Sequence, residues 1–196
     1  MRTIRLRLSW LVPAVALAAA VVGCGSGSSE QTKSTAAPPK PATSATEVTV
    51  AEVRADALDA AVAGYKDKVV VVDFWATWCA PCVKKFPHLV ALHEKYADGG
   101  LVCVSVSMDK LGPPEDYQHD KVLAFLKDKR ATFPNFIAAE PEKDEKAIAT
   151  RFGEFSGIPY MAIFDKAGRR AWDSGDAGSK VTDEQIDKKI EELLAK

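Results

Sequence analysis

A seven-residue run of six β-branched or aromatic residues and one carboxylate constrains this chain more than any other feature. The run, Val69–Trp75, reads Val-Val-Val-Val-Asp-Phe-Trp, and such a run is typical of a strand that is buried on both faces of a sheet. A turn with the sequence Cys-Ala-Pro-Cys follows at 79–82, and a helical pattern of apolar residues then extends to Tyr96. The sequence therefore predicts a buried strand that leads through a two-cysteine turn into a helix.

The chain after residue 48 shows further segments with the apolar patterns of strands and of helices. Further strands are predicted at 101–108, 133–139, 160–164 and 170–172, the last after a tight turn at 166–169. Further helices are predicted around 58–64, 122–126 and 143–152, and a final helix begins at the capping box Thr182–Gln185. This order predicts an α/β fold with a central mixed β-sheet flanked by helices.

The N-terminus is typical of an export signal. Arg2, Arg5 and Arg7 precede an apolar run at 11–22, which is too short to span a bilayer comfortably. The run ends in Val-Val-Gly-Cys, which resembles the lipobox of bacterial lipoproteins, in which the cysteine becomes the lipidated first residue. We therefore expect a signal peptide at 1–23 and lipidation at Cys24. The alternative is an ordinary cleaved signal with a chance cysteine.

A segment poor in large apolar residues follows this cysteine. Residues 24–47 are rich in Ser, Thr, Ala, Pro and Gly and cannot bury enough surface to fold. We expect the lipidated cysteine and a flexible tether at 24–47, and one folded domain at 48–196, which is long enough to build a core of its own.

Charge and cysteine content exclude several classes of protein. The chain has 26 Lys and Arg against 27 Asp and Glu, a formal charge of −1, so we expect no nucleic-acid partner. Four cysteines are too few for a disulfide-rich scaffold. No metal site is expected, because no second ligand pair accompanies the two-cysteine turn, His88 and His93 lie on different helix faces, and His119 is isolated.

The spacing of the two cysteines carries the chemistry. Two intervening residues place Cys79 at the helix N-terminus and Cys82 one turn further on, close enough for a disulfide. The free N–H groups and the dipole of the helix stabilise a thiolate at Cys79. That thiolate can attack a substrate disulfide, and Cys82 can then resolve the mixed disulfide. Pro81 fits the first helical turn, where its missing N–H is not needed.

Two motifs resemble the thioredoxin family. The segment 72–82, Val-Asp-Phe-Trp-Ala-Thr-Trp-Cys-Ala-Pro-Cys, with Pro87 after it, resembles the active-site segment of thioredoxin, and Gly-Ile-Pro-Tyr at 157–160 resembles the cis-proline loop of the family. An insertion at about 109–139, after the second core strand, the export signal and the tether resemble the membrane-anchored reductases of the TlpA/ResA type. The resemblance covers 48–196 and implies a thioredoxin fold.

The resemblance implies roles for the residues that carry it. Cys79 is the expected exposed nucleophile, Cys82 the buried resolving thiol, and Asp73 the carboxyl group that exchanges protons with Cys82. A carboxyl group at the end of an apolar strand also has physical reason for a raised pKa. The alternative for Asp73 is an exposed residue at the end of the strand.

The expected substrate contacts surround the cysteine pair. Pro159 is the expected cis-proline, and the backbone of Ile158 is expected to pair with an extended substrate chain. Trp78 is expected to shield one side of the thiols, and Pro81 belongs to the same surface. Two interpretations of Trp75 stay open: it packs in the core, or it has a role in the site. No cofactor is expected beyond the redox-active disulfide itself.

The sequence departs from the thioredoxin pattern at three positions. Ser105 stands where thioredoxin has a lysine near the buried carboxyl, and Ala80 replaces a glycine. Asp109 lies near the place where some anchored reductases carry an acidic residue, but we interpret it as a loop aspartate. Cys103, in an apolar strand, is interpreted as a core residue.

These features favour a thiol–disulfide oxidoreductase in the bacterial cell envelope, periplasmic or outer-facing, and anchored by lipid. The resemblance implies reduction of protein disulfides, such as those of haem-binding cysteines in apocytochrome c or of copper sites, with a membrane thiol protein as electron donor. The alternatives are a disulfide oxidase or isomerase, and a Cu(I) carrier that uses the same cysteines. A peroxidase is disfavoured, because the chain lacks the Pro-x-x-x-Ser/Thr-x-x-Cys pattern.

Overall fold

The computed structural model describes residues 47–154, 156–175, 178 and 180–196. The predicted signal peptide, Cys24 and the predicted tether up to residue 46 lie outside these residues, so those predictions stay untested. No helix among the described residues is long and apolar enough to cross a membrane.

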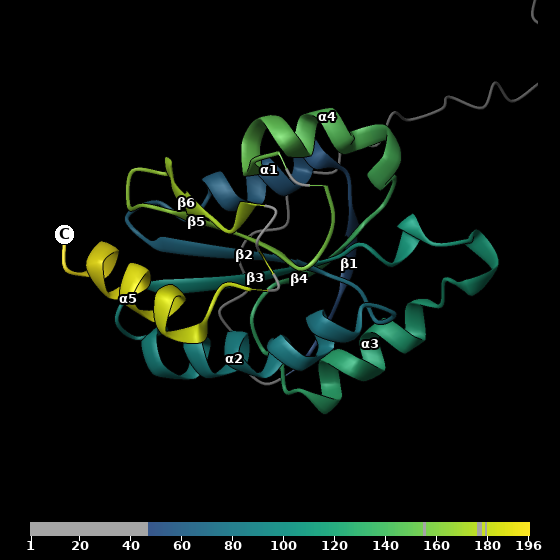
Figure 1. Cartoon of the computed structure of the whole chain (residues 1–196), viewed down its shortest axis with the longest axis horizontal. Coiled ribbons are helices and arrows are strands. Elements are labelled where there is room, and N and C mark those ends of the chain that lie inside the picture. The colour runs from purple at the N-terminus through teal and green to yellow at the C-terminus, as the bar shows by residue number, and fades with distance from the viewer. Residues whose placement is uncertain (1–46, 155, 176–177, 179) are drawn as a thin grey trace, which may run out of the picture. The chain divides into compact units, whose positions relative to one another are not determined.

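A mixed six-stranded sheet forms the centre of the described part (Figure 1), and its strand order is β1-β4-β3-β2-β5-β6. The first four strands in this order pair in parallel, whereas β5 runs antiparallel to both β2 and β6. The bounds are β1 Ala51–Val53, β2 Val69–Trp75, β3 Leu101–Ser107, β4 Asn135–Ala138, β5 Tyr160–Phe164 and β6 Arg170–Asp173. The predicted mixed sheet is confirmed.

Helices cover both faces of this sheet, as the buried run in β2 requires (Figure 1). The helices α1 and α4 lie over one face, and α2, α3 and α5 lie over the other. Their bounds are α1 Ala55–Ala63, α2 Ala80–Tyr96, α3 His119–Asp128, α4 Pro141–Phe152 and α5 Asp183–Leu194. The predicted helices are all present, and α4 begins earlier than predicted, because Pro141 suits the first turn of a helix.

The predicted insertion adds to the sheet. Residues 109–139 hold two short 3-10 turns, η1 Asp109–Leu111 and η2 Pro114–Asp116, and then α3 and β4. Strand β4 lies between β1 and β3, so the insertion widens the sheet on the side away from β5. The three-residue strand β1 was not predicted, because so short a segment shows no periodicity.

Alternation along β2 decides which residues face the cysteines. Val69, Val71 and Trp75 pack into the core on the side of α2, α3 and α5, together with both cysteines of the 79–82 turn. Val70, Val72 and Phe74 pack on the other side, with residues of α1 and α4. Asp73, an odd-numbered position of the strand, therefore points to the face that carries the cysteines.

Candidate active site

The two cysteines of the turn form a disulfide at the start of α2, with their Cα atoms 5.2 Å apart. Cys79 is the N-cap of the helix, and the backbone N–H of Cys82 donates to its Sγ at 3.3 Å. Pro81 lies in the first turn, where no intrahelical donor is lost. When the disulfide is reduced, this N–H and the helix dipole would stabilise a thiolate on Cys79.

The prediction of an exposed Cys79 was wrong for the oxidised protein. Only 6% of Cys79 is exposed, compared with 2% of Cys82. The cover comes from the loop before β5: the peptide bond between Ile158 and Pro159 is cis, as the resemblance implied, and the Ile158 carbonyl oxygen lies 3.8 Å from the Sγ of Cys79. The loop therefore lies directly against the disulfide.

Asp73 lies in the middle of the sheet and is buried, with 9% of its surface exposed. It is aligned with Ser105 of β3 on one side and with Met161 of β5 on the other. Burial raises the pKa of Asp73 to about 7, against the opposing attraction of the Lys85 ammonium. This burial rules out the alternative of an exposed residue at the strand end. A carboxyl group with this pKa can accept and release a proton near neutral pH.

Asp109 is not the loop aspartate that the sequence predicted. It is buried at the start of η1 and accepts hydrogen bonds from the backbone N–H of Thr77 at 3.1 Å and from the hydroxyl groups of Thr77 and Ser107. Thr77 belongs to the segment that joins β2 to the cysteine turn. The insertion therefore holds this segment in place through one buried carboxylate.

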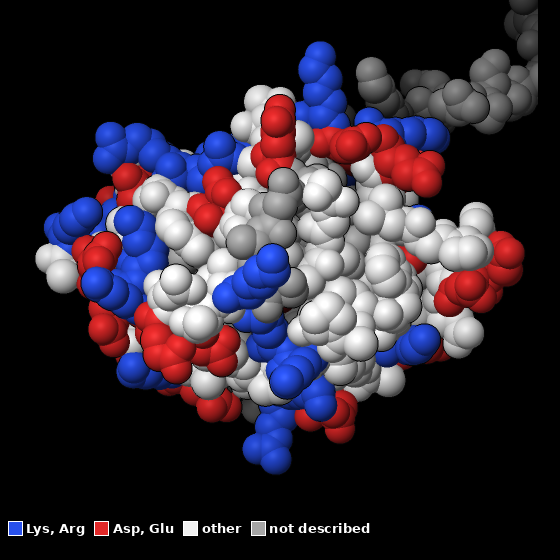
Figure 2. Space-filling model, viewed as in Figure 1, with Lys and Arg blue, Asp and Glu red and all other residues white. Residues whose placement is uncertain are grey.

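Trp78 and Ile158 line an open groove of about 1030 Å³ beside the disulfide. Trp78 (52% exposed) and Leu111 (40%) are the large hydrophobic residues exposed in the described part of the chain, and both line this groove. Figure 2 shows an uncharged area on the viewed face, with both acidic and basic side chains beside it over α4. The charged residues that line the groove are Glu142, Glu145, Glu154 and Lys146, so acidic side chains outnumber basic ones there.

The remaining candidates have structural explanations. Trp75 is fully buried, and its ring lies 4.7 Å from the rings of both Phe86 and Phe125, which favours the packing interpretation. Cys103 is completely buried, and burial raises the pKa of its thiol, so its reactive thiolate form is disfavoured. Among the described residues, no group of three or more His, Cys, Asp or Glu side chains could hold a metal ion. That the protein binds no metal ion and no cofactor beyond its own disulfide remains a prediction.

The comparisons with known proteins agree with this geometry. The family model described as Redoxin matches residues 40–185. The chain belongs to the Redoxin family. It is 28% identical over 131 residues to the thiol-disulfide oxidoreductase ResA of Bacillus cereus, over 67% of this chain and 64% of that protein. It is 34% identical over 103 residues to the thioredoxin-like protein YneN of Bacillus subtilis, over 53% of this chain and 54% of that protein. This Redoxin-family chain thus spans just under two thirds of the ResA proteins that it matches.

Solved structures confirm the thioredoxin-like fold. A thiol:disulfide interchange protein of the thioredoxin family from Chlorobium tepidum has a TM-score of 0.55 at 22% identity, over 67% of this chain and 83% of that chain. The exposed lipoprotein thioredoxin Etrx1 of Streptococcus pneumoniae has a TM-score of 0.52 at 20% identity, over 67% and 90% of the two chains. At these identities the likeness concerns the fold alone.

Sequence reasoning missed two charged residues close to the site. Asp109 was assigned to a loop, and Lys85 was not considered, although it follows Cys82 by three residues and so lies near it on the surface of α2. The spacing could have revealed Lys85. Nothing in the local sequence around Asp109 shows that Thr77 would be its partner, 32 residues away.

Proposed function

We propose that this protein is an extracytoplasmic thiol–disulfide oxidoreductase that reduces disulfides of other proteins through Cys79 and Cys82. The observation that carries the proposal is the disulfide at the N-terminus of α2, against the loop of Ile158 and Pro159. The names of the ResA relatives, thiol-disulfide oxidoreductase, support the same activity.

The reduced protein would act in two steps. The Cys79 thiolate attacks one sulfur of a substrate disulfide and forms a mixed disulfide, and the other substrate sulfur leaves as a thiolate. Cys82 then gives its proton to Asp73 and attacks the Sγ of Cys79, which releases the second substrate thiolate. The substrate gains two electrons, and the protein returns to the oxidised form of the structure.

The groove beside the disulfide supports a protein substrate. Its size and its exposed Trp78 and Leu111 suit an extended segment of polypeptide. The backbone of Ile158 is proposed to pair with such a segment. The proposed substrates are proteins with oxidised cysteine pairs, such as the haem-binding cysteines of apocytochrome c or those of copper sites. A thiol protein of the membrane is the proposed electron donor.

The proposed location is the bacterial cell envelope, on the periplasmic or outer side of a membrane. The basic start, the apolar run at 11–22 and the lipobox-like end at Cys24 support export and lipidation. These residues lie outside the described structure, so the sequence pattern alone carries this part of the proposal.

The reduction potential of the cysteine pair tests the proposed direction. We expect a value of roughly −220 mV or below, which is the range of thioredoxins and glutaredoxins. The potential is measured by equilibration with thiol buffers and trapping with an alkylating reagent. A value near −120 mV, in the range of a strong oxidant, would instead make this protein a disulfide-forming enzyme.

Two cysteine variants test the assignment of the thiols. Cys79→Ser should abolish the reduction of a disulfide-bonded protein substrate, because it removes the attacking thiolate. The matched control is Cys103→Ser, which also removes one thiol, but a buried one on β3; it should reduce the same substrate at the unaltered rate. Activity that survives in Cys79→Ser would contradict the proposal.

A further inference from the structure

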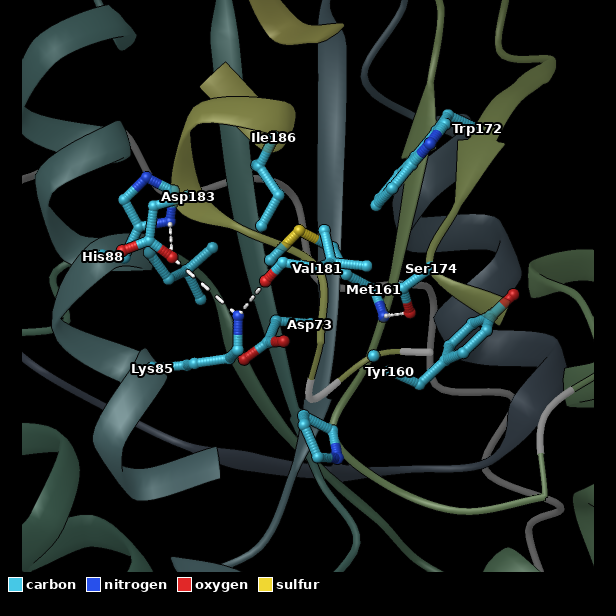
Figure 3. Close-up of a pocket in the computed structure, with 13 residues that line it drawn as sticks. Asp73, Lys85, His88, Tyr160, Met161, Trp172, Ser174, Val181, Asp183 and Ile186 are labelled. Carbon is cyan, nitrogen blue, oxygen red and sulfur yellow. Dashed lines mark hydrogen bonds and ion pairs between the residues drawn. The ribbon is translucent and has the colours of Figure 1, made fainter. Parts of the chain in front are cut away.

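A small pocket lies beside the carboxyl group of Asp73 (Figure 3). Its volume is about 20 Å³, which is enough for one water molecule. Residues of β2, α2, β5, β6 and α5, of the cis-proline loop and of the segment before α5 line it, among them Asp73, Lys85, His88, Tyr160, Val181 and Asp183. The buried carboxyl group therefore borders a small pocket between α2 and α5 that the charged side chains of Lys85 and Asp183 also line.

Lys85 supplies the positive charge of this pocket. Its Nζ donates to the Val181 carbonyl oxygen at 2.5 Å and lies 3.9 Å from the Oδ1 of Asp183. Figure 3 shows the ammonium group between this carbonyl and the carboxyl group of Asp73. The side chain is 28% exposed, so its charge is only partly screened by solvent. The segment that leads into α5 therefore holds the ammonium close to Asp73.

The other ionisable groups around Asp73 do not take the place of Lys85. His88 faces α5, with Nε2 2.8 Å from Asp187 Oδ1 and Nδ1 3.5 Å from Asp183 Oδ1. The Tyr160 hydroxyl donates to the Phe152 carbonyl oxygen on the other side of the sheet, and the buried thiol of Cys103 is uncharged. Ser105, which is aligned with Asp73, donates its hydroxyl to Asn135. Lys85 is the cation among the described residues that line the pocket.

We propose that Lys85 is a positioning residue for proton transfer in the redox reaction, because its ammonium, held by the Val181 carbonyl, favours the ionised form of Asp73. This inference rests on the proposed function. Without a nearby cation, a carboxyl group buried in the sheet would stay protonated at neutral pH and could not accept a proton. The cation comes from α2, next to the resolving cysteine, whereas the neighbouring strand offers only a serine at position 105.

The step that Lys85 assists is the resolution of the mixed disulfide. The Cys82 S–H proton passes to the ionised carboxyl group of Asp73, and the sulfur of Cys82 forms a bond with the Sγ of Cys79. The bond between Cys79 and the substrate sulfur breaks, and the substrate leaves as a thiolate. The two protein thiols are oxidised to the disulfide, and the substrate disulfide is reduced. Asp73 then returns its proton to water.

The experiment follows the titration of Asp73 in the oxidised full chain by ¹³C NMR of its carboxyl carbon. Lys85→Gln should raise the titration midpoint by about one pH unit, because an opposite charge close to the carboxyl group is lost. Lys84→Gln is the matched control: it removes the same charge from an exposed neighbour on α2 and should leave the midpoint unchanged. Lys85→Arg should restore the midpoint, since it restores the charge.

The pH profile of substrate reduction gives an independent readout. The alkaline shift of the Asp73 midpoint in Lys85→Gln should shift the profile in the same direction, an effect that a merely structural role would not produce. If Lys85→Gln does not fold, Lys85→Met keeps the apolar stem and tests the same charge. A folded Lys85→Gln or Lys85→Met protein with an unchanged midpoint would overturn the inference and leave the proposed function intact. A wild-type protein that reduces no disulfide would overturn the proposed function and this role with it.

Discussion

At the scale of single residues, Asp73 is where stability and chemistry oppose each other. The six other residues of β2 are apolar and fully or almost fully buried, and an apolar residue in place of Asp73 would remove the free-energy cost of a buried charge. The same burial raises the pKa of Asp73 to about 7. A cost in stability thus accompanies the property that proton transfer near neutral pH requires.

This cost predicts a specific dependence of stability on pH. Because the pKa of Asp73 is about 7 in the folded protein and ordinary in the unfolded chain, the folded state binds more protons between about pH 4 and pH 7. The free energy of unfolding should therefore fall as the pH rises through this window. Asp73→Asn should abolish this part of the fall and be more stable than wild type at pH 8, by up to about 4 kcal/mol.

Urea unfolding of both oxidised proteins at pH 4.5 and pH 8 measures this effect. The difference between the two proteins isolates Asp73, since every other titrating group is common to both. Parallel pH profiles for wild type and Asp73→Asn would show that burial does not perturb this carboxyl group.

The same scale shows what local sequence can and cannot reveal. Cys79 and Cys82 were found from sequence because their spacing and their place between a strand and a helix are local properties. Asp109 was misassigned because its burial depends on Thr77, which precedes it by 32 residues. Lys85 has its partner, the Val181 carbonyl, 96 residues away. Contacts of this kind are decided by tertiary packing, which a local pattern does not contain.

At the scale of elements, the end of α4 packs closely against the start of β5. Gly153 is the C-cap of α4 and has a φ of +116°. Close to it, the hydroxyl of Tyr160, the first residue of β5, donates to the Phe152 carbonyl oxygen at 2.8 Å. A Cβ atom at position 153 would overlap this hydroxyl group and the guanidinium group of Arg170. Glycine is therefore required for this junction of α4 with β5.

Two glycine variants separate the overlap from the backbone conformation. Gly153→Ala should lower the free energy of unfolding by about 3 kcal/mol, because it strains the backbone and displaces a buried hydrogen bond. Gly168→Ala is the control, since Gly168 also has a positive φ (+73°) but has open space around it; it should cost only about 1 kcal/mol. Chemical denaturation under identical conditions measures both. Equal costs would show that the Tyr160 contact contributes nothing.

Element prediction succeeded where a segment is long and its burial is one-sided or complete. The seven-residue run of β2 and the Thr182–Gln185 capping box of α5 predicted their elements correctly. Strand β1 was missed because its three residues pair with β4 from the insertion, at a register that only the assembled sheet defines. The order of the strands likewise follows from how the insertion enters between β1 and β3, which the linear sequence does not show.

At the scale of the whole molecule, the candidate active site and the predicted anchor are formed by different parts of the chain. The disulfide and the groove need only the residues of the described domain. The predicted tether of about 23 residues would extend on the order of 25 Å as a flexible coil. That length would let the domain reorient toward the proposed membrane donor and toward a proposed protein substrate in turn.

The predicted lipid anchor at Cys24 implies that the protein is found in the membrane fraction. The first 23 residues contain three arginines and no acidic residue, so the rest of the chain has 23 basic and 27 acidic side chains, a formal charge of −4. This charge does not favour binding to anionic lipids. Membrane association should therefore depend on acyl chains at Cys24.

Cys24→Ala should move the protein from the membrane pellet to the soluble fraction and abolish incorporation of labelled fatty acid. Cys103→Ser, which changes a buried cysteine, should stay in the pellet. If Cys24→Ala also stays there, the acyl anchor is refuted, and the membrane contact must come from another part of the chain.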